Sequence, residues 1–315
     1  MSRIEQLLSA ERPFLTDGGF ETSLFFKDGF DAPEFAAITL MDNKDAVDAM
    51  KRYFDGFLAM AESVGVGYVL DTNTWRGSVA WAEKLGLTED ELLVLSRDAV
   101  DLAVDIRKKW ESRVSPILVN GVIGPAGDGY APDQLLSPEQ ARKLHASQVK
   151  IFADKEVDMI SAITMTHVGE AIGITNATDE AGIPVVISFT VETDGRLPAG
   201  ETIGEAINAV DSATQHAPLY YMLNCAHPDH FSEALKSQEA WIWRIGGIRA
   251  NASRLSHAEL DAATELDEGN PEEFGRLHED MIGMLPNLRV VGGCCGTDHR
   301  HVQCVSRHVH VRNAA

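Results

Sequence analysis

The sequence predicts a single-domain α/β protein with the (β/α)8, or TIM, barrel fold. Short apolar segments alternate with longer amphipathic helical segments, and the 315 residues contain eight such strand-then-helix units. The strand segments are apolar throughout rather than alternating, which is typical of parallel strands buried on both faces. Barrels of this kind typically need about 250 residues. A doubly wound open sheet is the main alternative. Because no low-complexity linker interrupts the chain, we expect one domain over residues 1–315.

The expected elements follow in chain order. The expected strands are Phe14–Asp17, Tyr68–Thr72, Ile117–Ile123, Met159–Thr164, Pro184–Phe189, Tyr220–Cys225, Trp241–Ile245 and Arg289–Val291. The expected helices are Asp45–Val64, Glu89–Glu111, Pro138–Lys155, His167–Ala181, Ile203–His216, Pro228–Lys236, a bipartite segment from His257 to Met284, and a last helix beginning near Asp298.

Helix start and stop signals support these boundaries. Thr88 stands before three acidic residues, as an N-cap does. Pro138 occupies the first helical position after Ser137, where proline is favoured. Gly182 follows the fourth helix, as a C-terminal glycine would.

Composition excludes several classes of function. The formal net charge is −21 and no Lys/Arg cluster interrupts the acidic balance, so we expect no binding to nucleic acid. No segment approaches the roughly 20 apolar residues of a membrane span, and residues 1–13 lack the apolar core of a signal peptide. Four cysteines, two of them adjacent, do not resemble a secreted disulfide framework. We therefore expect a soluble cytoplasmic protein.

Three of the four cysteines lie at the ends of two expected strands. Cys225 ends the sixth strand, and Cys294 and Cys295 follow the eighth. In this barrel the C-terminal ends of the strands form the active-site face, so the three thiols are expected to meet there. Neighbouring strand residues point to opposite sides, so two adjacent cysteines share one ion only where the backbone turns, and the flanking glycines permit that turn. The residues thus predict a zinc site with one open position. Cys225 alone would be interpreted as a small core residue, and so is Cys304, which lies in a helical segment.

The ligand type indicates the chemistry. Three thiolates give a zinc site a net charge of −1. A substrate thiol in the fourth position would still lose its proton, from a free pKa of about 8.5, and would keep an electron-rich sulfur. This arrangement favours alkyl transfer to sulfur.

The chain resembles the homocysteine S-methyltransferase family, the zinc-dependent barrel enzymes that include the betaine- and S-methylmethionine-using enzymes. The matching motifs run in family order over nearly the whole chain: Thr-Asp-Gly-Gly-Phe-Glu-Thr at 16–22, Asp-Thr-Asn-Thr-Trp at 71–75, Gly-Val-Ile-Gly-Pro at 121–125, Ile-Ser-Phe at 187–189 with Gly-Arg-Leu at 195–197, Asn-Cys at 224–225 and Gly-Cys-Cys-Gly-Thr at 293–297.

The resemblance implies roles for particular residues. It implies that Cys225, Cys294 and Cys295 bind Zn²⁺ and that Asp17, with the backbone around Gly18, holds the amino-acid part of the acceptor; a turn-capping role for Asp17 is the alternative. Further expected cavity residues are Asn73 and Thr74, for which turn-forming roles are equally compatible, Trp75, and Asn224, which would support the adjacent ligand.

One position departs from the family pattern. Relatives commonly carry a glutamate after the fourth strand that helps to hold the ammonium group of homocysteine, and Ile163 stands in its place. Isoleucine cannot pair with an ammonium group. Either Asp17 does this alone, or the acceptor is a different thiol or a selenol.

A second departure covers residues 241–253. Asn251 matches an asparagine of the family, whereas Arg244 and Arg249 are additional charges. An arginine near the mouth of the barrel would grip a substrate carboxylate; a surface salt bridge is the alternative.

The methyl donor is the least determined part. Because only a short segment follows the second cysteine motif, we expect no folate or cobalamin domain, and hence a free small-molecule donor of the S-methylmethionine, S-adenosylmethionine or betaine type. The ring of Trp75 would cradle such a cation, with packing as the alternative.

The sequence therefore predicts a zinc-dependent S-methyltransferase that moves a methyl group from a small onium donor to a zinc-bound thiolate, with homocysteine giving methionine. No catalytic residue beyond the zinc site is expected. The alternatives are another thiol or selenol acceptor, a non-catalytic zinc or thiol protein, and a redox protein using the adjacent cysteines. In the non-catalytic protein a histidine would be the fourth ligand, and the candidates are His227, His230, His299 and His301. A homo-oligomer is compatible with the sequence.

Overall fold

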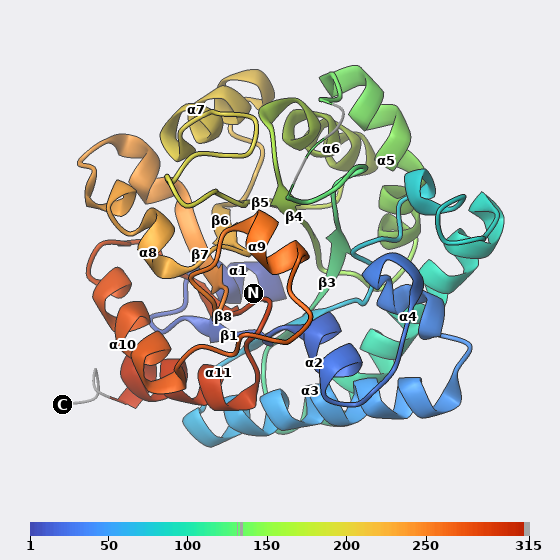
Figure 1. The fold of residues 1–315 in the computed structure, drawn as a ribbon, viewed down its shortest axis with the longest axis horizontal. Coiled ribbons are helices and arrows are strands. Elements are labelled where there is room, and N and C mark those ends of the chain that lie inside the picture. Colours follow the sequence, from blue (N-terminus) through green and yellow to red (C-terminus); the bar gives the residue numbers. More distant parts are fainter. Residues whose placement is uncertain (131, 133–134, 312–315) are drawn as a thin grey trace.

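The computed structural model, which describes residues 1–130, 132 and 135–311, is a closed barrel of eight parallel strands in the order β1 to β8 (Figure 1). This confirms the fold that the sequence predicts. β1 pairs with both β2 and β8, which closes the barrel. The strands are β1 (Phe14–Leu15), β2 (Tyr68–Asp71), β3 (Ile117–Ile123), β4 (Met159–Met165), β5 (Val185–Phe189), β6 (Tyr221–Asn224), β7 (Ile245–Ala250) and β8 (Val290–Gly293).

Helices surround the barrel and follow its strands. They are α1 (Arg3–Leu8), α2 (Phe20–Phe26), α3 (Lys44–Val64), α4 (Glu89–Trp110), α5 (Pro138–Ala153), α6 (Val168–Ala181), α7 (Ile203–Thr214), α8 (Pro228–Phe231), α9 (His257–Asp261), α10 (Pro271–Ile282) and α11 (His299–Ser306). The expected caps are present: Thr88 and Ser137 form capping boxes, and Gly182 adopts a left-handed conformation after α6. Asp298 caps α11 through its side chain.

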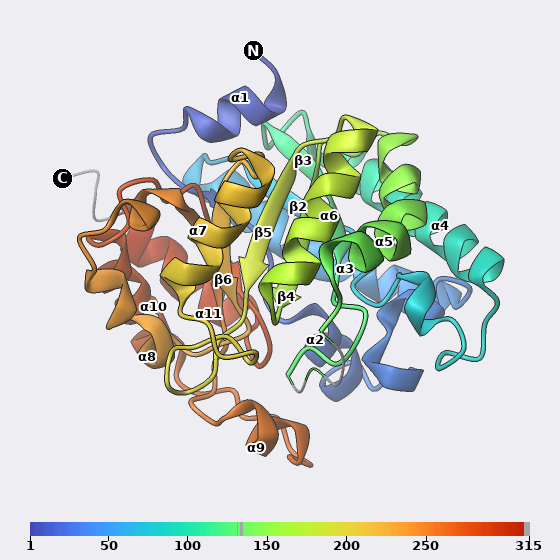
Figure 2. The same ribbon diagram turned by 90° about the horizontal axis from the view of Figure 1, so that it is seen from above.

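The two ends of the barrel differ in what covers them. Helix α1, which was not expected from the sequence, lies across the N-terminal end (Figure 2). There Leu7 packs into a core of strand residues that includes Phe14, Val69 and Met222. At the opposite end lies α9. The N-terminal end is thus filled by apolar side chains, and the C-terminal end is left for a site.

Above that apolar layer, the inward side chains of the strands are polar. Asn120 donates to Asp71 at 2.7 Å and accepts from Ser161 at 2.9 Å, and Ser188 donates to Asn224 at 2.6 Å. All five are buried. Buried polar groups are retained where they satisfy one another, and this hydrogen-bonded layer forms the floor of the site.

Two expected elements were wrong. The expected strand Trp241–Ile245 is mostly a 3-10 helix, Ala240–Arg244, and β7 begins at Ile245. The apolar tryptophans of this segment resemble the residues of a buried strand. β7 itself contains Gly246 and Gly247, where an added Cβ atom would lie 2.7 Å from Tyr220 and 2.6 Å from Met222, respectively. The expected helix Pro228–Lys236 is broken into α8 and a 3-10 turn.

The bipartite segment lies against the same chain. In α10, Phe274 and Met281 are buried, and this helix contacts α11. Of α9 only His257 is buried. Within the described ranges, no helix has both the length and the apolar character required to cross a bilayer.

Candidate functional site

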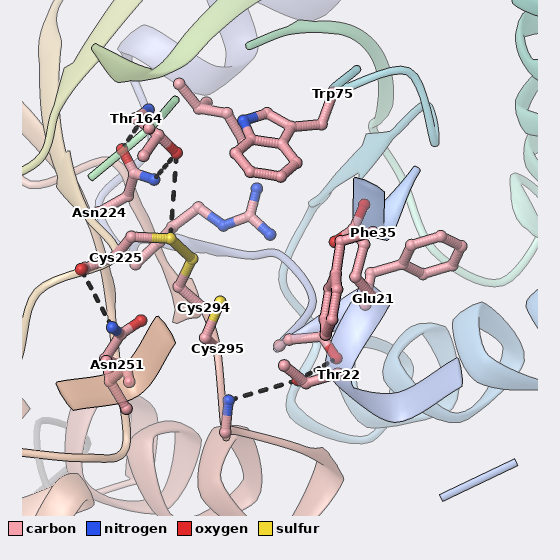
Figure 3. A pocket seen from close by; sticks show the side chains of 18 of the residues that line it. Glu21, Thr22, Phe35, Trp75, Thr164, Asn224, Cys225, Asn251, Cys294 and Cys295 are labelled. Carbon is pink, nitrogen blue, oxygen red and sulfur yellow. Dashed lines mark hydrogen bonds between the residues drawn. A yellow bond between two sulfur atoms is a disulfide. The ribbon is translucent and has the colours of Figure 1, made fainter. Parts of the chain in front are cut away.

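A cavity of about 440 Å³ lies at the C-terminal ends of the strands (Figure 3). Its lining comes from the C-terminal end of β4 and from the ends of β1, β2, β3, β6, β7 and β8 with the loops that follow them. Cys225, Cys294 and Cys295 lie on one side of it, with Glu21, Phe35 and Trp75 across the space from them. The C-terminal face of the barrel therefore holds the three predicted ligands.

The three cysteine sulfurs form one cluster. Their Sγ atoms lie within 4.8 Å of one another. The structure joins Cys225 and Cys294 in a disulfide and leaves Cys295 free. In this form the two bonded sulfurs are not thiolates, so binding of an ion by all three requires reduction of that bond. Cys304, as expected, is buried away from the cluster.

The backbone around Cys225 is held in an unusual conformation that aims its side chain at the cluster. Cys225 has a φ of 54°, in the left-handed region that non-glycine residues rarely adopt. Its carbonyl oxygen accepts from Asn251 Nδ2 at 3.0 Å and contacts His257 Nε2 at 2.9 Å. These contacts from the segment after β7 stabilise the turn that ends β6.

The loop after β8 is fixed by close packing against the loop after β1. A Cβ atom on Gly19 would lie 2.7 Å from the Cys294 carbonyl oxygen and 3.2 Å from the Cys295 Cα atom. The Gly19 N–H donates to Thr297 O at 3.0 Å. Only glycine at position 19 permits the adjacent cysteines to approach β1 this closely.

The reduced cluster fits a tetrahedral metal ion. Zinc–sulfur bonds of about 2.3 Å at tetrahedral angles place sulfurs about 3.8 Å apart, and three sulfurs already within 4.8 Å need only small side-chain rotations. Burial raises the pKa of the Cys295 thiol to about 11. A cation among the sulfurs would offset that effect, since a coordinating thiol is deprotonated outright.

No fourth protein ligand joins the cluster among the residues that the structure describes. The four histidines considered as closing ligands have other partners: His227 accepts from the Asp229 N–H, and His230, His299 and His301 contact the carbonyl oxygens of Arg254, Tyr53 and Glu268. The cluster thus resembles a three-ligand catalytic site more than a closed structural one.

Arg249 links two carboxylates on the cavity floor. Its guanidinium donates to Asp17 and Asp71, and its Nε donates to Gly293 O at 3.3 Å. Asp17 also accepts from Tyr53 Oη at 3.3 Å. Burial raises the pKa of Asp17, and the Arg249 guanidinium opposes that rise. The charge of Asp17 is therefore matched within the protein.

The structure corrects the interpretation of Arg244. Because β7 begins at Ile245, Arg244 lies at the N-terminal end of the barrel, where it pairs with Asp211 at 2.8 Å. It is not near the mouth. Arg249 does lie at the correct end, but its donors are used by protein groups.

The remaining expected residues divide into lining and wall. Gly18, Asn73, Trp75 and Asn224 line the cavity. The Thr74 hydroxyl instead donates to Val122 O at 2.7 Å, which makes Thr74 part of the wall.

Asn224 has a structural role beside its ligand neighbour. It accepts from the Thr164 N–H at 2.9 Å and donates to Thr164 Oγ1 at 2.9 Å. Thr164, with a φ of 60°, lies 3.9 Å from the Cys225 sulfur. Asn224 therefore ties the end of β4 to Cys225.

Sequence reasoning missed three residues of the site. The Tyr130 hydroxyl donates to the Cys295 sulfur at 3.7 Å, and its ring stacks on His257 at 4.1 Å. Glu21, in the first turn of α2, lines the cavity, and burial raises its pKa to about 7. Tyr130 and His257 carry no motif, whereas Glu21 lies inside the motif 16–22 and its charge was the available signal.

Known homocysteine methyltransferases are similar to this chain in sequence and in fold. The chain is 20% identical to homocysteine S-methyltransferase 1 of Arabidopsis thaliana, over 93% of this chain and 92% of that protein. It is 24% identical to betaine–homocysteine S-methyltransferase 1 of Rattus norvegicus, over 96% of this chain and 74% of that protein. The metallated form of the homocysteine methyltransferase MmuM from Escherichia coli has a similar fold, with a TM-score of 0.75 at 17% identity, covering 96% of this chain and 99% of that one.

The family model described as homocysteine S-methyltransferase matches residues 14–309, which include every strand and all three clustered cysteines. The chain therefore belongs to the homocysteine S-methyltransferase family.

Proposed function

We propose that this protein is a zinc-dependent methyltransferase that moves a methyl group from a small onium donor to the sulfur of homocysteine, giving methionine. The observation that carries the proposal is the cluster of three cysteine sulfurs, within 4.8 Å of one another and without a fourth protein ligand among the described residues, at the edge of a 440 Å³ cavity. A cavity of this size suits small substrates.

Cys225, Cys294 and Cys295 would hold the ion in their reduced state. When bound, Zn²⁺ supplies the Lewis acid that makes an acceptor thiol ionise near neutral pH. Relatives support this assignment, since one solved form of MmuM is described as metallated and another as oxidised. We also propose a cytoplasmic location, because that compartment keeps thiols reduced.

The protein's own residues contribute orientation and shielding. Phe35, Trp75 and Tyr130 line the cavity with aromatic surface, which suits an onium donor and excludes water from the reacting sulfur. Direct attack of the acceptor sulfur on the donor's methyl carbon forms one S–C bond as the bond to the leaving group breaks. No protein side chain has to move a proton during that step, and positioning is the main contribution.

A second acceptor remains a candidate because of the cavity lining. Ile163 lines the cavity and brings no charge to it, and Asp17 is already paired with Arg249. Both observations favour the alternative of a different thiol or a selenol. A non-catalytic zinc or thiol protein is less well supported, because the described cluster is open rather than closed.

A donor-by-acceptor screen tests the proposal. Reduced, zinc-loaded protein is incubated with S-methylmethionine, S-adenosylmethionine, betaine or a dimethylsulfonium compound, each with homocysteine and several other thiols. We expect methionine, identified by mass, from at least one donor. Methylation of another thiol but not homocysteine would select the alternative acceptor, and no methylated product from any pair would contradict the assignment.

A further inference from the structure

The cavity lacks the ammonium partners that the family resemblance implies, although it retains another carboxylate. Ile163 is apolar, and Asp17 is satisfied by Arg249 and Tyr53. Asp71 is likewise paired, with Arg249 and Asn120. An α-ammonium group entering this cavity would need a carboxylate that the protein has not already matched.

Glu21 is such a carboxylate. It lies in the first turn of α2, directly after the close contact between Gly19 and the cysteine loop, and it lines the cavity. Figure 3 shows it across the cavity from the sulfurs. Its negative charge contributes to raising the pKa of Cys295, so it lies within electrostatic range of the cluster. No other described residue donates a hydrogen bond to it. A half-buried carboxylate without a partner is costly unless a ligand supplies one.

Arg76 is a positively charged side chain of the same cavity with nitrogen atoms that lack hydrogen-bond partners among the described residues. Its guanidinium lies 3.8 Å from the centroid of the Trp81 ring and 4.7 Å from that of Trp75, and it lines the same cavity. The Nε and Nη1 atoms are buried and have no hydrogen-bond partner in the described structure. Burial lowers the pKa of Arg76 and nearby carboxylates, including Glu21, raise it. A carboxylate that binds along one edge of the guanidinium would accept from Nη2 and from one of the two atoms Nε and Nη1 at once.

We infer that Glu21 and Arg76 form a clamp for the two charged groups of an amino-acid thiol: Glu21 binds its α-ammonium and Arg76 its α-carboxylate. The inference rests on the proposed function and specifies its acceptor. It retains homocysteine as the substrate while replacing the expected ammonium partners, Asp17 and the family glutamate, by Glu21.

The change of charge during methyl transfer indicates that Glu21 binds the α-ammonium of the acceptor rather than the onium centre of the donor. Attack by a thiolate on an onium group removes the positive charge from that centre. A carboxylate held against it would stabilise the reactants more than the transition state and would slow transfer. An α-ammonium keeps its charge throughout, so Glu21 can bind it without that penalty.

Substrate analogues that lack one charge each test the clamp. The acceptors are homocysteine, 4-mercaptobutyrate, which lacks the ammonium, and 3-mercaptopropylamine, which lacks the carboxylate. The proteins are the wild type, Glu21→Gln, Arg76→Gln and, as a control, Glu11→Gln, which changes an exposed carboxylate outside the cavity. Binding to reduced, zinc-loaded protein is measured by calorimetry without donor, and kcat/KM is measured with a dimethylsulfonium donor and with S-methylmethionine.

We expect Glu21→Gln to weaken homocysteine binding about 10- to 100-fold while changing 4-mercaptobutyrate binding less than about threefold. Arg76→Gln should weaken the binding of homocysteine and 4-mercaptobutyrate while sparing that of 3-mercaptopropylamine, and Glu11→Gln should change none of the three. Equal losses for homocysteine and 4-mercaptobutyrate in Glu21→Gln, or no loss for either, would overturn the inference. A loss confined to the KM of S-methylmethionine would assign the ammonium to the donor and also overturn it. If the wild type forms no methylated product, the proposed function fails, and the calorimetric ratios still decide the clamp.

Discussion

Replacing Arg249 with Met tests whether this residue holds two buried carboxylates together. The side chains of Asp17 and Asp71 are only 2% and 10% exposed, and that of Arg249 is 8% exposed. Removing one partner of a buried ion pair costs about 3–5 kcal/mol, because the remaining charge is left without compensation. For a chain of 315 residues we expect Tm to fall by about 5–8 °C.

The assay is thermal unfolding followed by circular dichroism at pH 7.5, at one fixed scan rate. The matched control is Arg113→Met, which breaks the ion pair between Arg113 and Glu62. The side chains of these two residues are 51% and 36% exposed. Exposed pairs contribute at most about 1 kcal/mol, so the control should move Tm by no more than about 2 °C.

The pH dependence of Arg249→Met gives a second readout. Without the guanidinium, the folded-state pKa of Asp17 rises further above the unfolded value of about 3.9. The folded variant then binds more protons than the unfolded chain, so its stability falls as pH rises. The Tm deficit should therefore be smaller at pH 5.5 than at pH 7.5. Equal Tm losses in Arg249→Met and Arg113→Met would refute the role of Arg249 as a buried link.

Three further predictions follow from named contacts. Asn251→Ala removes the 3.0 Å hydrogen bond to the Cys225 carbonyl and should weaken zinc affinity about 10- to 100-fold in a chelator competition, whereas Cys304→Ser should leave it unchanged. Burial lowers the pKa of His278 to about 4, so as pH falls below about 6.5 this histidine is protonated in the unfolded chain before it is protonated in the folded protein. Tm should therefore drop between pH 6.5 and 4.5. A His278→Gln variant whose Tm fell as steeply with pH as that of the wild type would contradict this. Ile163→Glu places a carboxylate at the cavity wall and should leave the KM for homocysteine unchanged or lower it; a marked rise, with another thiol well used by the wild type, would indicate a different acceptor.

The barrel could be predicted because its signal is repeated along the chain. Strands such as Ile117–Ile123 are apolar on both faces, and capping residues such as Thr88 mark the helix starts. β7 could not be found in the same way. Two glycines occupy this strand because the barrel interior there has no room for Cβ atoms, and Arg249 occupies it because it pairs with Asp17 and Asp71. These tertiary contacts replace the apolar residues by which a buried strand is recognised in a sequence.

The cysteine cluster could be predicted for a related reason. Three thiols at strand ends must meet once the strands form a barrel, whatever the intervening sequence. The charged residues of the cavity were harder, because their role depends on pairing. Asp17 was expected to bind substrate, and in the structure it pairs with Arg249. Glu21 lies in the motif 16–22, but its position in the cavity could not be predicted from that motif.

The metal content of the protein tests the central claim most directly. Protein purified anaerobically under reducing conditions is analysed for zinc by mass spectrometry beside Cys225→Ser, Cys294→Ser and Cys295→Ser. We predict about one zinc ion per wild-type chain and a marked loss in each variant. Reduced wild-type protein that binds no zinc when the ion is added, or three serine variants that all retain it, would contradict the three-sulfur site.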